Sequence, residues 1–170
     1  MRVYQRENVI DPIATFMEYA RELERACLEL QHQASPAWSH TAEFIDVQAP
    51  TYRRDLEQAV LPLLKSRVPA EHEESDLSRT LILVAAELAE LDTRWHELKP
   101  ALERESAAVL GERITAYAEL WEQHVDRLEN HVIPALHAVL RERDMTLLGA
   151  ALARHQGVLW SADDTPDANS

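Results

Sequence analysis

The sequence contains few residues that cross-link a chain or interrupt a helix. Of its 170 residues, three are glycine, eight are proline and one is cysteine. Three glycines are too few for a glycine-rich phosphate-binding loop, and there is no Cys-x-x-Cys or nucleophilic serine motif. The single cysteine, Cys27, cannot form an internal disulfide, which favours a reducing cytoplasm. We therefore predict a cytoplasmic protein that is not an enzyme.

Basic residues and long apolar runs are also scarce. The chain has 17 lysines and arginines against 30 aspartates and glutamates, a net charge of −13 at pH 7. Nucleic-acid binding needs a surplus of basic residues, so no nucleic-acid partner is expected. No apolar run approaches the roughly 20 residues that cross a membrane, and the first residues lack the apolar stretch of a signal peptide. The sequence indicates no membrane partner and leaves a protein partner and the oligomeric state open.

The abundance of alanine, leucine and glutamate favours helices. Apolar residues recur at steps of three and four in long segments, at about 11–33, 39–66, 76–100 with a continuation to about 109, and 112–140. A shorter helix is expected at about 145–155, and strand signals are absent. Short connections predict an all-α, up-down-up-down four-helix bundle with a short additional C-terminal helix. This domain would span 1–157, followed by an acidic tail, 158–170, that we expect to be disordered.

The apolar pattern also predicts the core. The aromatic side chains expected inside the bundle are Phe16, Phe44, Trp95, Tyr117 and Trp121. The longest apolar run, 81–86, is expected to be a buried helix segment, and Gly111 to break the chain between two helices. Trp38 and Trp160 flank helix ends, where we expect them to cap the bundle.

Two segments 72 residues apart have nearly the same sequence, one from Tyr52 to Leu64 and the other from His124 to Leu136. Aligned without gaps, they share a leucine, a glutamate, a valine, a proline and a second leucine. Proline removes a backbone donor and breaks or kinks a helix, so its recurrence in two helix-patterned segments indicates one helix-pair unit used twice. In each unit a polar ring and an acid precede the proline, and such groups build metal sites inside helical bundles.

These repeated segments resemble the hemerythrin-like (HHE cation-binding) domain family. The stretch 44–62 is similar to the second-helix pattern of the family, and 124–134 is similar to its fourth-helix pattern. The opening Asp11-Pro12-Ile13 also resembles the start of the first helix, and the resemblance extends to about Gly157. It implies a four-helix bundle that binds two irons through histidines and bridging carboxylates. Family members carry oxygen, or sense oxygen, nitric oxide or iron.

Most family ligand positions hold other residues here. In the register of the resemblance, histidine positions fall on Ala20, Tyr52 and Leu88. The first of the paired acids on the second helix falls on Leu56. Alanine and leucine cannot bind a metal. The resemblance therefore implies a degenerate member whose di-iron site is largely lost, with no cofactor and a regulatory or protein-interaction role.

The remaining candidate positions are Tyr52, Glu57, His124 and Glu129. Buried carboxylates are costly unless they are paired, so these groups need compensation. We favour a metal-free polar cluster in which Tyr52 donates its hydroxyl to an acid and His124 is protonated. The alternative is a mononuclear iron site that senses or stores, because phenolate, imidazole and carboxylate all bind iron.

Three further histidines are expected to lie outside any site. His96 lies eight residues beyond Leu88, roughly 12 Å along a helix axis, and so a layer away from the family site. His131 and His137 follow His124 on the fourth helix without partners of metal-ligand spacing. We predict that all three are surface residues.

Overall fold

The computed structural model describes residues 11–32, 38–68 and 76–155, and every regular element within them is a helix. The prediction of an all-α chain is confirmed for these ranges, which contain no strand. The expected domain end at 157, the acidic tail and Trp160 lie outside the described residues.

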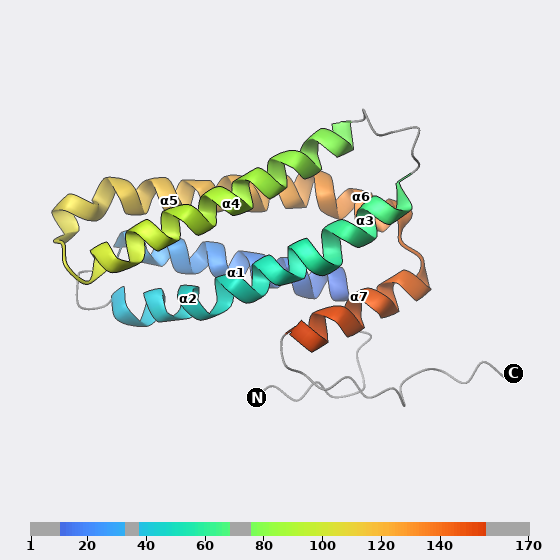
Figure 1. Ribbon diagram of the computed structural model, residues 1–170, viewed down its shortest axis with the longest axis horizontal. Helices are drawn as coiled ribbons and strands as arrows, with labels where there is room; N and C mark the ends of the chain where they lie inside the picture. The colour runs from blue at the N-terminus through green and yellow to red at the C-terminus, as the bar shows by residue number, and fades with distance from the viewer. Residues whose placement is uncertain (1–10, 33–37, 69–75, 156–170) are drawn as a thin grey trace, which may run out of the picture.

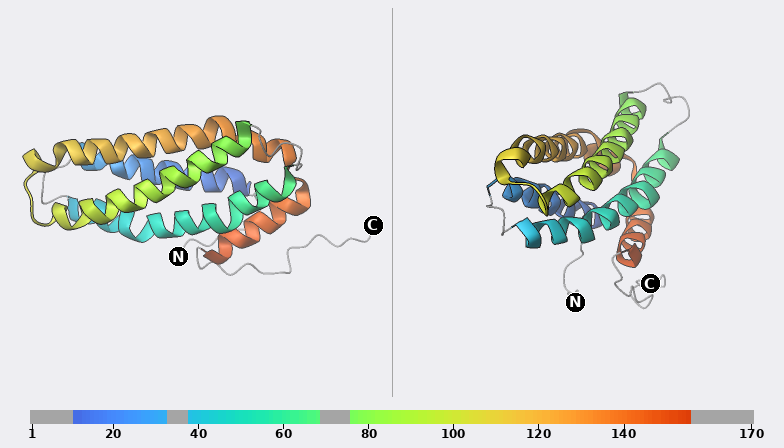
Figure 2. Two further views of the ribbon diagram at one scale, coloured as in Figure 1. Left: turned by 45° about the horizontal axis from the view of Figure 1, so that its top comes forward. Right: turned by 60° about the vertical axis from the view of Figure 1, so that its left-hand side comes forward.

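The long helices lie side by side in a bundle-like arrangement (Figures 1 and 2). The first two long stretches are α1, Pro12–His32, and α2, Trp38–Asp55, which continues through the π-helical η2, Leu56–Val60, into α3, Leu61–Arg67. The next two are α4, Asp76–Leu102, and α5, Ala107–Arg127, which continues through the π-helical η4, Leu128–Val132, into α6, Ile133–Val139. The last helix, α7, Glu142–His155, packs against α1, α2 and η2 on the outside (Figure 1).

The sequence placed the turn between the third and fourth long stretches wrongly. We expected a continuation to about 109 and a break at Gly111, but Gly111 lies inside α5. The chain turns earlier, where the amides of Arg104 and Glu105 donate to the carbonyl of Ala101 at 3.0 and 2.9 Å. Ser106 is extended, and its carbonyl accepts the first bonds of α5. A helix tolerates an isolated glycine, so Gly111 does not end one.

The core follows the predicted helical period, with two corrections. Phe16, Trp95, Tyr117 and Trp121 are buried as expected. Phe44 is 36% exposed, because Ile45 beside it takes the inward position. The run 81–86 is not buried as a unit. Successive residues of a helix turn by about 100°, so Leu81 and Val84 face the core while Ile82 is 69% exposed.

Trp38 caps one end of the bundle-like arrangement of helices, as predicted. It is buried at the start of α2, and its indole Nε1 donates to the carbonyl of Leu30 near the end of α1 at 3.2 Å. Among the described residues, no helix combines the length and apolarity needed to cross a membrane.

Candidate functional site

Each repeated segment contains a π turn at the same place. In the first, the amide of Leu61 donates to the carbonyl of Leu56, and in the second, the amide of Ile133 donates to the carbonyl of Leu128. Each of these bonds spans five residues instead of four, and each is followed directly by the repeated proline. The π turn accommodates a residue that lacks an amide hydrogen. The repeat therefore encodes a local helix distortion twice, where we expected a simple kink.

The polar rings of the two repeats meet in the core. The Tyr52 hydroxyl lies 2.7 Å from Nε2 of His124, and both side chains are fully buried. The prediction that these two positions approach each other is correct. The expected partner of the hydroxyl was wrong, however, because Tyr52 bonds the imidazole and not an acid.

A carboxylate that the sequence analysis missed lies behind His124. Oε2 of Glu87, on α4, is 3.3 Å from Nδ1 of His124, and its Oε1 accepts from Nε of Arg127 at 2.7 Å. A carboxylate only accepts hydrogen bonds, so Nδ1 carries the ring hydrogen. In the neutral ring Nε2 then accepts the hydrogen of the Tyr52 hydroxyl. Tyr52, His124, Glu87 and Arg127 thus form one chain of hydrogen bonds, which we call the Tyr52–His124 cluster.

The electrostatics of the cluster follow from burial and from this chain of bonds. Burial raises the pKa of Tyr52 well above its usual value, and the charges of Glu87 and Asp55 raise it further. Burial also acts to raise the pKa of Glu87, but the hydrogen bonds from His124 and Arg127, together with the charge of Arg127, outweigh it and lower that pKa. The cluster therefore holds a neutral phenol at one end and the ion pair of Glu87 and Arg127 at the other.

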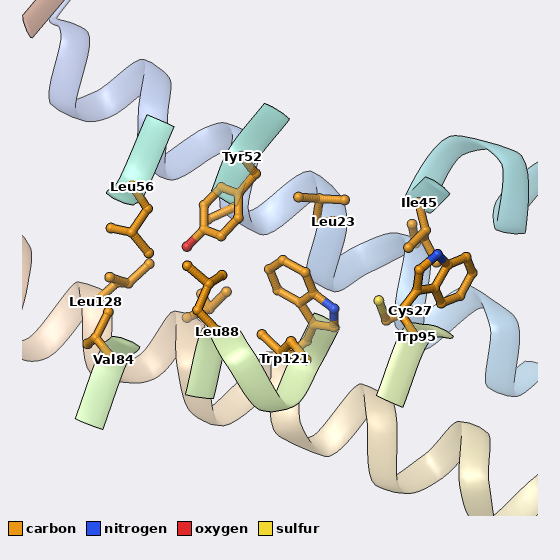
Figure 3. Packing of buried hydrophobic residues seen from close by; sticks show 14 of the residues in the cluster. Leu23, Cys27, Ile45, Tyr52, Leu56, Val84, Leu88, Trp95, Trp121 and Leu128 are labelled. Atoms are coloured by element: carbon orange, nitrogen blue, oxygen red, sulfur yellow. The ribbon is translucent and has the colours of Figure 1, made fainter. Parts of the chain in front are cut away.

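Aromatic and aliphatic side chains surround Tyr52. Its ring stacks on Phe16 with a centroid separation of 5.4 Å, and the ring of Trp121 lies at the same separation. Figure 3 shows the Tyr52 hydroxyl directed into the core near Leu88. The cluster therefore lies in an apolar environment, where hydrogen bonds are strong and unpaired polar atoms are costly.

The two predicted acids do not join the cluster. Glu57 is 41% exposed and pairs with Arg53 at 3.1 Å, while Glu129 is 37% exposed and pairs with Arg21 at 2.6 Å. The structure therefore brings together two of the four candidate residues and leaves the two acids at the exterior. The burial we expected for these acids is wrong.

The residues present do not fit a di-iron centre. Ala20 and Leu88, at two family histidine positions, are buried and apolar, and so is Leu56 at the position of a family acid. Across residues 11–32, 38–68 and 76–155, no three histidine, cysteine, aspartate or glutamate side chains are grouped so that they could hold a metal ion. Both ring nitrogens of His124 are also engaged, one by Tyr52 and one by Glu87.

Comparison with protein-family models, curated proteins and solved structures finds no match to this chain. The hemerythrin-like resemblance therefore remains a prediction that rests on the repeated segments and their register.

Other features of the structure lie apart from the cluster. His96, His131 and His137 are exposed, as predicted. One groove of about 580 Å³ lies between α1 and α6 and is lined by Ile13, Met17 and His137, among others. A second groove, between α1 and α5, is bordered by both acids and arginines. Neither groove is lined by Tyr52, His124 or Glu87, so neither opens onto the cluster.

Proposed function

We propose that the protein is a hemerythrin-like, up-down-up-down four-helix bundle in which a hydrogen-bonded cluster has replaced the di-iron centre. In this proposal it is a cytoplasmic, non-enzymatic protein with a regulatory or protein-interaction role. The observation that carries the proposal is the 2.7 Å contact between the Tyr52 hydroxyl and His124 Nε2, with Glu87 on the other ring nitrogen.

Three features support a structural role for the cluster. Both ring nitrogens of His124 have protein partners, Nε2 in Tyr52 and Nδ1 in Glu87, so a metal would have to displace one of these side chains. The predicted acid ligands form exterior ion pairs. Buried and fully bonded polar groups have also been found to specify how helices align, which suits a scaffold protein.

A non-enzymatic role is supported by the burial of the cluster. Tyr52 and His124 have no exposed surface, and no described groove leads to them. A nucleophile or general base must reach a substrate within hydrogen-bond distance, which this position does not allow. The surface of the bundle is then the part of the protein available for a partner.

The test is elemental analysis of untagged, freshly purified protein, with an ultraviolet-visible spectrum recorded in air. We expect far less than one iron per chain and no tyrosinate-to-iron band. Added ferrous or ferric iron should leave the melting temperature unchanged in both the wild type and His124→Leu, because neither binds the ion in its folded state. One iron per chain that is lost in His124→Leu would overturn the proposal in favour of a mononuclear iron protein.

A further inference from the structure

The last helix, α7, is held in place differently from the long helices. α1 buries eight residues, whereas α7 buries only Asp144, Leu148 and Leu152. These three residues and His155 recur at steps of four, four and three, so they lie on one face of the helix. Elements with few buried apolar contacts are the first to open locally. Among the described helices, α7 is therefore a candidate for reversible opening.

Both ends of α7 are attached through charged groups. At one end Asp144 accepts two hydrogen bonds from the guanidinium of Arg67, on α3, at 3.2 and 2.5 Å. At the other end Nδ1 of His155 lies 2.8 Å from Oδ1 of Asp55, the last residue of α2. We call the surface covered by α7 the α7 groove: the faces of α1, α2 and η2, with Arg67 at one end and Asp55 at the other.

The α7 groove has the properties of a helix-binding site. Its two ends carry opposite charges, separated along α7 by 11 residues, or about 16 Å. An apolar groove would hold a covering helix equally well, whereas charged ends also select the direction and register of the helix. Asp55 is fully buried beneath α7, and His155 supplies it with a polar partner from that helix.

The connection to α7 permits it to leave. α6 ends at Val139 and α7 begins at Glu142, with Leu140 in an extended conformation between them. The connection consists of Leu140 and Arg141. A rotation of the backbone at Leu140 and Arg141 would move α7 away without disturbing the long helices, since hinges of this kind absorb large dihedral changes.

We propose that the α7 groove binds an amphipathic helix of a partner protein and that α7 occupies it as an autoinhibitory segment. The partner helix would carry an acid, two leucine-like residues and a basic or donor residue at positions i, i+4, i+8 and i+11. This is the pattern of Asp144, Leu148, Leu152 and His155. The proposal rests on the protein-interaction role proposed above and names the kind of partner.

The probe for the test is a fluorescein-labelled synthetic peptide with the sequence of residues 142–155. The full-length double variant Leu148→Ser/Leu152→Ser should release α7, because both changes lie on α7 and leave the groove unaltered. We expect this variant to bind the peptide at least ten-fold more tightly than the wild type does, as measured by fluorescence anisotropy. A labelled peptide carrying the same two serines is the matched control and should not bind.

A second comparison tests whether the bound peptide places Asp144 against Arg67, as α7 does in the structure. Adding Arg67→Gln to the opened variant should weaken binding of the wild-type peptide several-fold but have no effect on a peptide with Asp144→Asn. Failure of the opened variant to bind, while its circular dichroism remains helical, would overturn the proposal. So would equal binding by the wild type, since α7 would then not be inhibitory.

Hydrogen exchange on the unaltered protein keeps the proposal testable if the opened variant does not fold. Amides of α7 should exchange at least ten-fold faster than those of α1, α4 and α5, and protection equal to theirs would overturn the proposal. A wild-type dimer with exchanged α7 helices, detected by light scattering, would also overturn it and assign the groove to a second copy. Iron bound at His124 would contradict the proposed function but leave these peptide results interpretable, because α7 does not contribute to the Tyr52–His124 cluster.

Discussion

The Tyr52 hydroxyl and the His124 imidazole, which occupy the same position in two repeats 72 residues apart, are joined by a 2.7 Å hydrogen bond. Leu56 and Leu128, four residues further along each repeat, are both buried in the same hydrophobic core (Figure 3). The two units therefore meet across the core through equivalent positions. A phenol in one and an imidazole in the other supply the donor and the acceptor that such a buried pair needs.

The hydrogen bond between Tyr52 and His124 should be visible as an energetic coupling. Tyr52→Phe leaves Nε2 of His124 buried without a donor, and we expect it to lower the free energy of unfolding by about 1–3 kcal/mol. His124→Leu leaves the Tyr52 hydroxyl unpaired and should cost a similar amount. The double variant should cost less than the sum of the two, by about 0.5–3 kcal/mol, in urea denaturation.

The control for this cycle is Tyr19→Phe, which removes a hydroxyl that bonds the carbonyl of Gln48 at 2.9 Å and its side chain at 2.7 Å. Its cost should add to that of His124→Leu. Additive costs for Tyr52→Phe and His124→Leu as well would show that their contact contributes no coupling.

Glu87 should make the protein more stable at neutral pH than in acid. Its pKa is lowered in the folded state, so its contribution is complete above the unfolded value of about 4.3 and disappears as the pH falls through the folded value. The stability difference between the wild type and Glu87→Gln should therefore be largest near neutrality and shrink below about pH 4. Urea denaturation at a series of pH values measures it.

The matched control is Glu90→Gln on the same helix. Glu90 forms an exposed ion pair with Arg94, and its replacement should change stability little at any pH. A wild-type advantage over Glu87→Gln that grows on acidification would contradict the assigned role of Glu87.

The sequence predicted the helices well because their apolar period is regular, and it located one end of the cluster because Tyr52 and His124 are matched by the repeat. Glu87 was missed because it has no counterpart in the repeat and resembles the other acids on α4. Its role depends on which face of α4 meets α5, which periodicity alone does not determine.

The positions of the predicted acids were wrong for a geometric reason. Glu57 and Glu129 lie five residues after Tyr52 and His124, and five residues of α-helix turn by about 140°. The residues that share the inward face are four positions along, Leu56 and Leu128. The π turns begin at these leucines and were not predicted, because the proline pattern indicates a distortion but not its kind.

Replacing the exterior acids should have little effect. We expect Glu57→Gln and Glu129→Gln, singly or together, to change the free energy of unfolding by no more than about 0.5 kcal/mol each, because exposed ion pairs contribute little. Thermal melts with and without added iron provide the measurement. If either acid were a metal ligand, its replacement would instead abolish a stabilisation by iron that the wild type showed.

The carboxylate of Glu24 should destabilise the folded protein near neutral pH, whereas that of Glu87 stabilises it. Burial raises its pKa in the folded state, and the charges of Glu122 and Glu129 raise it further. A raised folded pKa means that the carboxylate destabilises the folded state at pH values above that pKa, and that the penalty disappears below the unfolded value. Glu24→Gln should therefore stabilise the protein near neutrality, by up to about 0.5 kcal/mol.

The stabilisation by Glu24→Gln should depend on pH and on salt, and these two dependences distinguish it from a general effect of removing negative charge. The advantage of Glu24→Gln should narrow as the pH falls from the raised pKa of the folded state to the unfolded value of about 4.3, because the wild-type carboxylate takes up its proton over that range. It should also narrow in high salt, which screens the repulsion from Glu122 and Glu129. Glu29→Gln, an exposed change on the same helix, is the matched control and should show neither trend. Equal stabilisation by both variants, with the same response to pH and salt, would mean that the net charge of −13 is responsible and not the surroundings of Glu24.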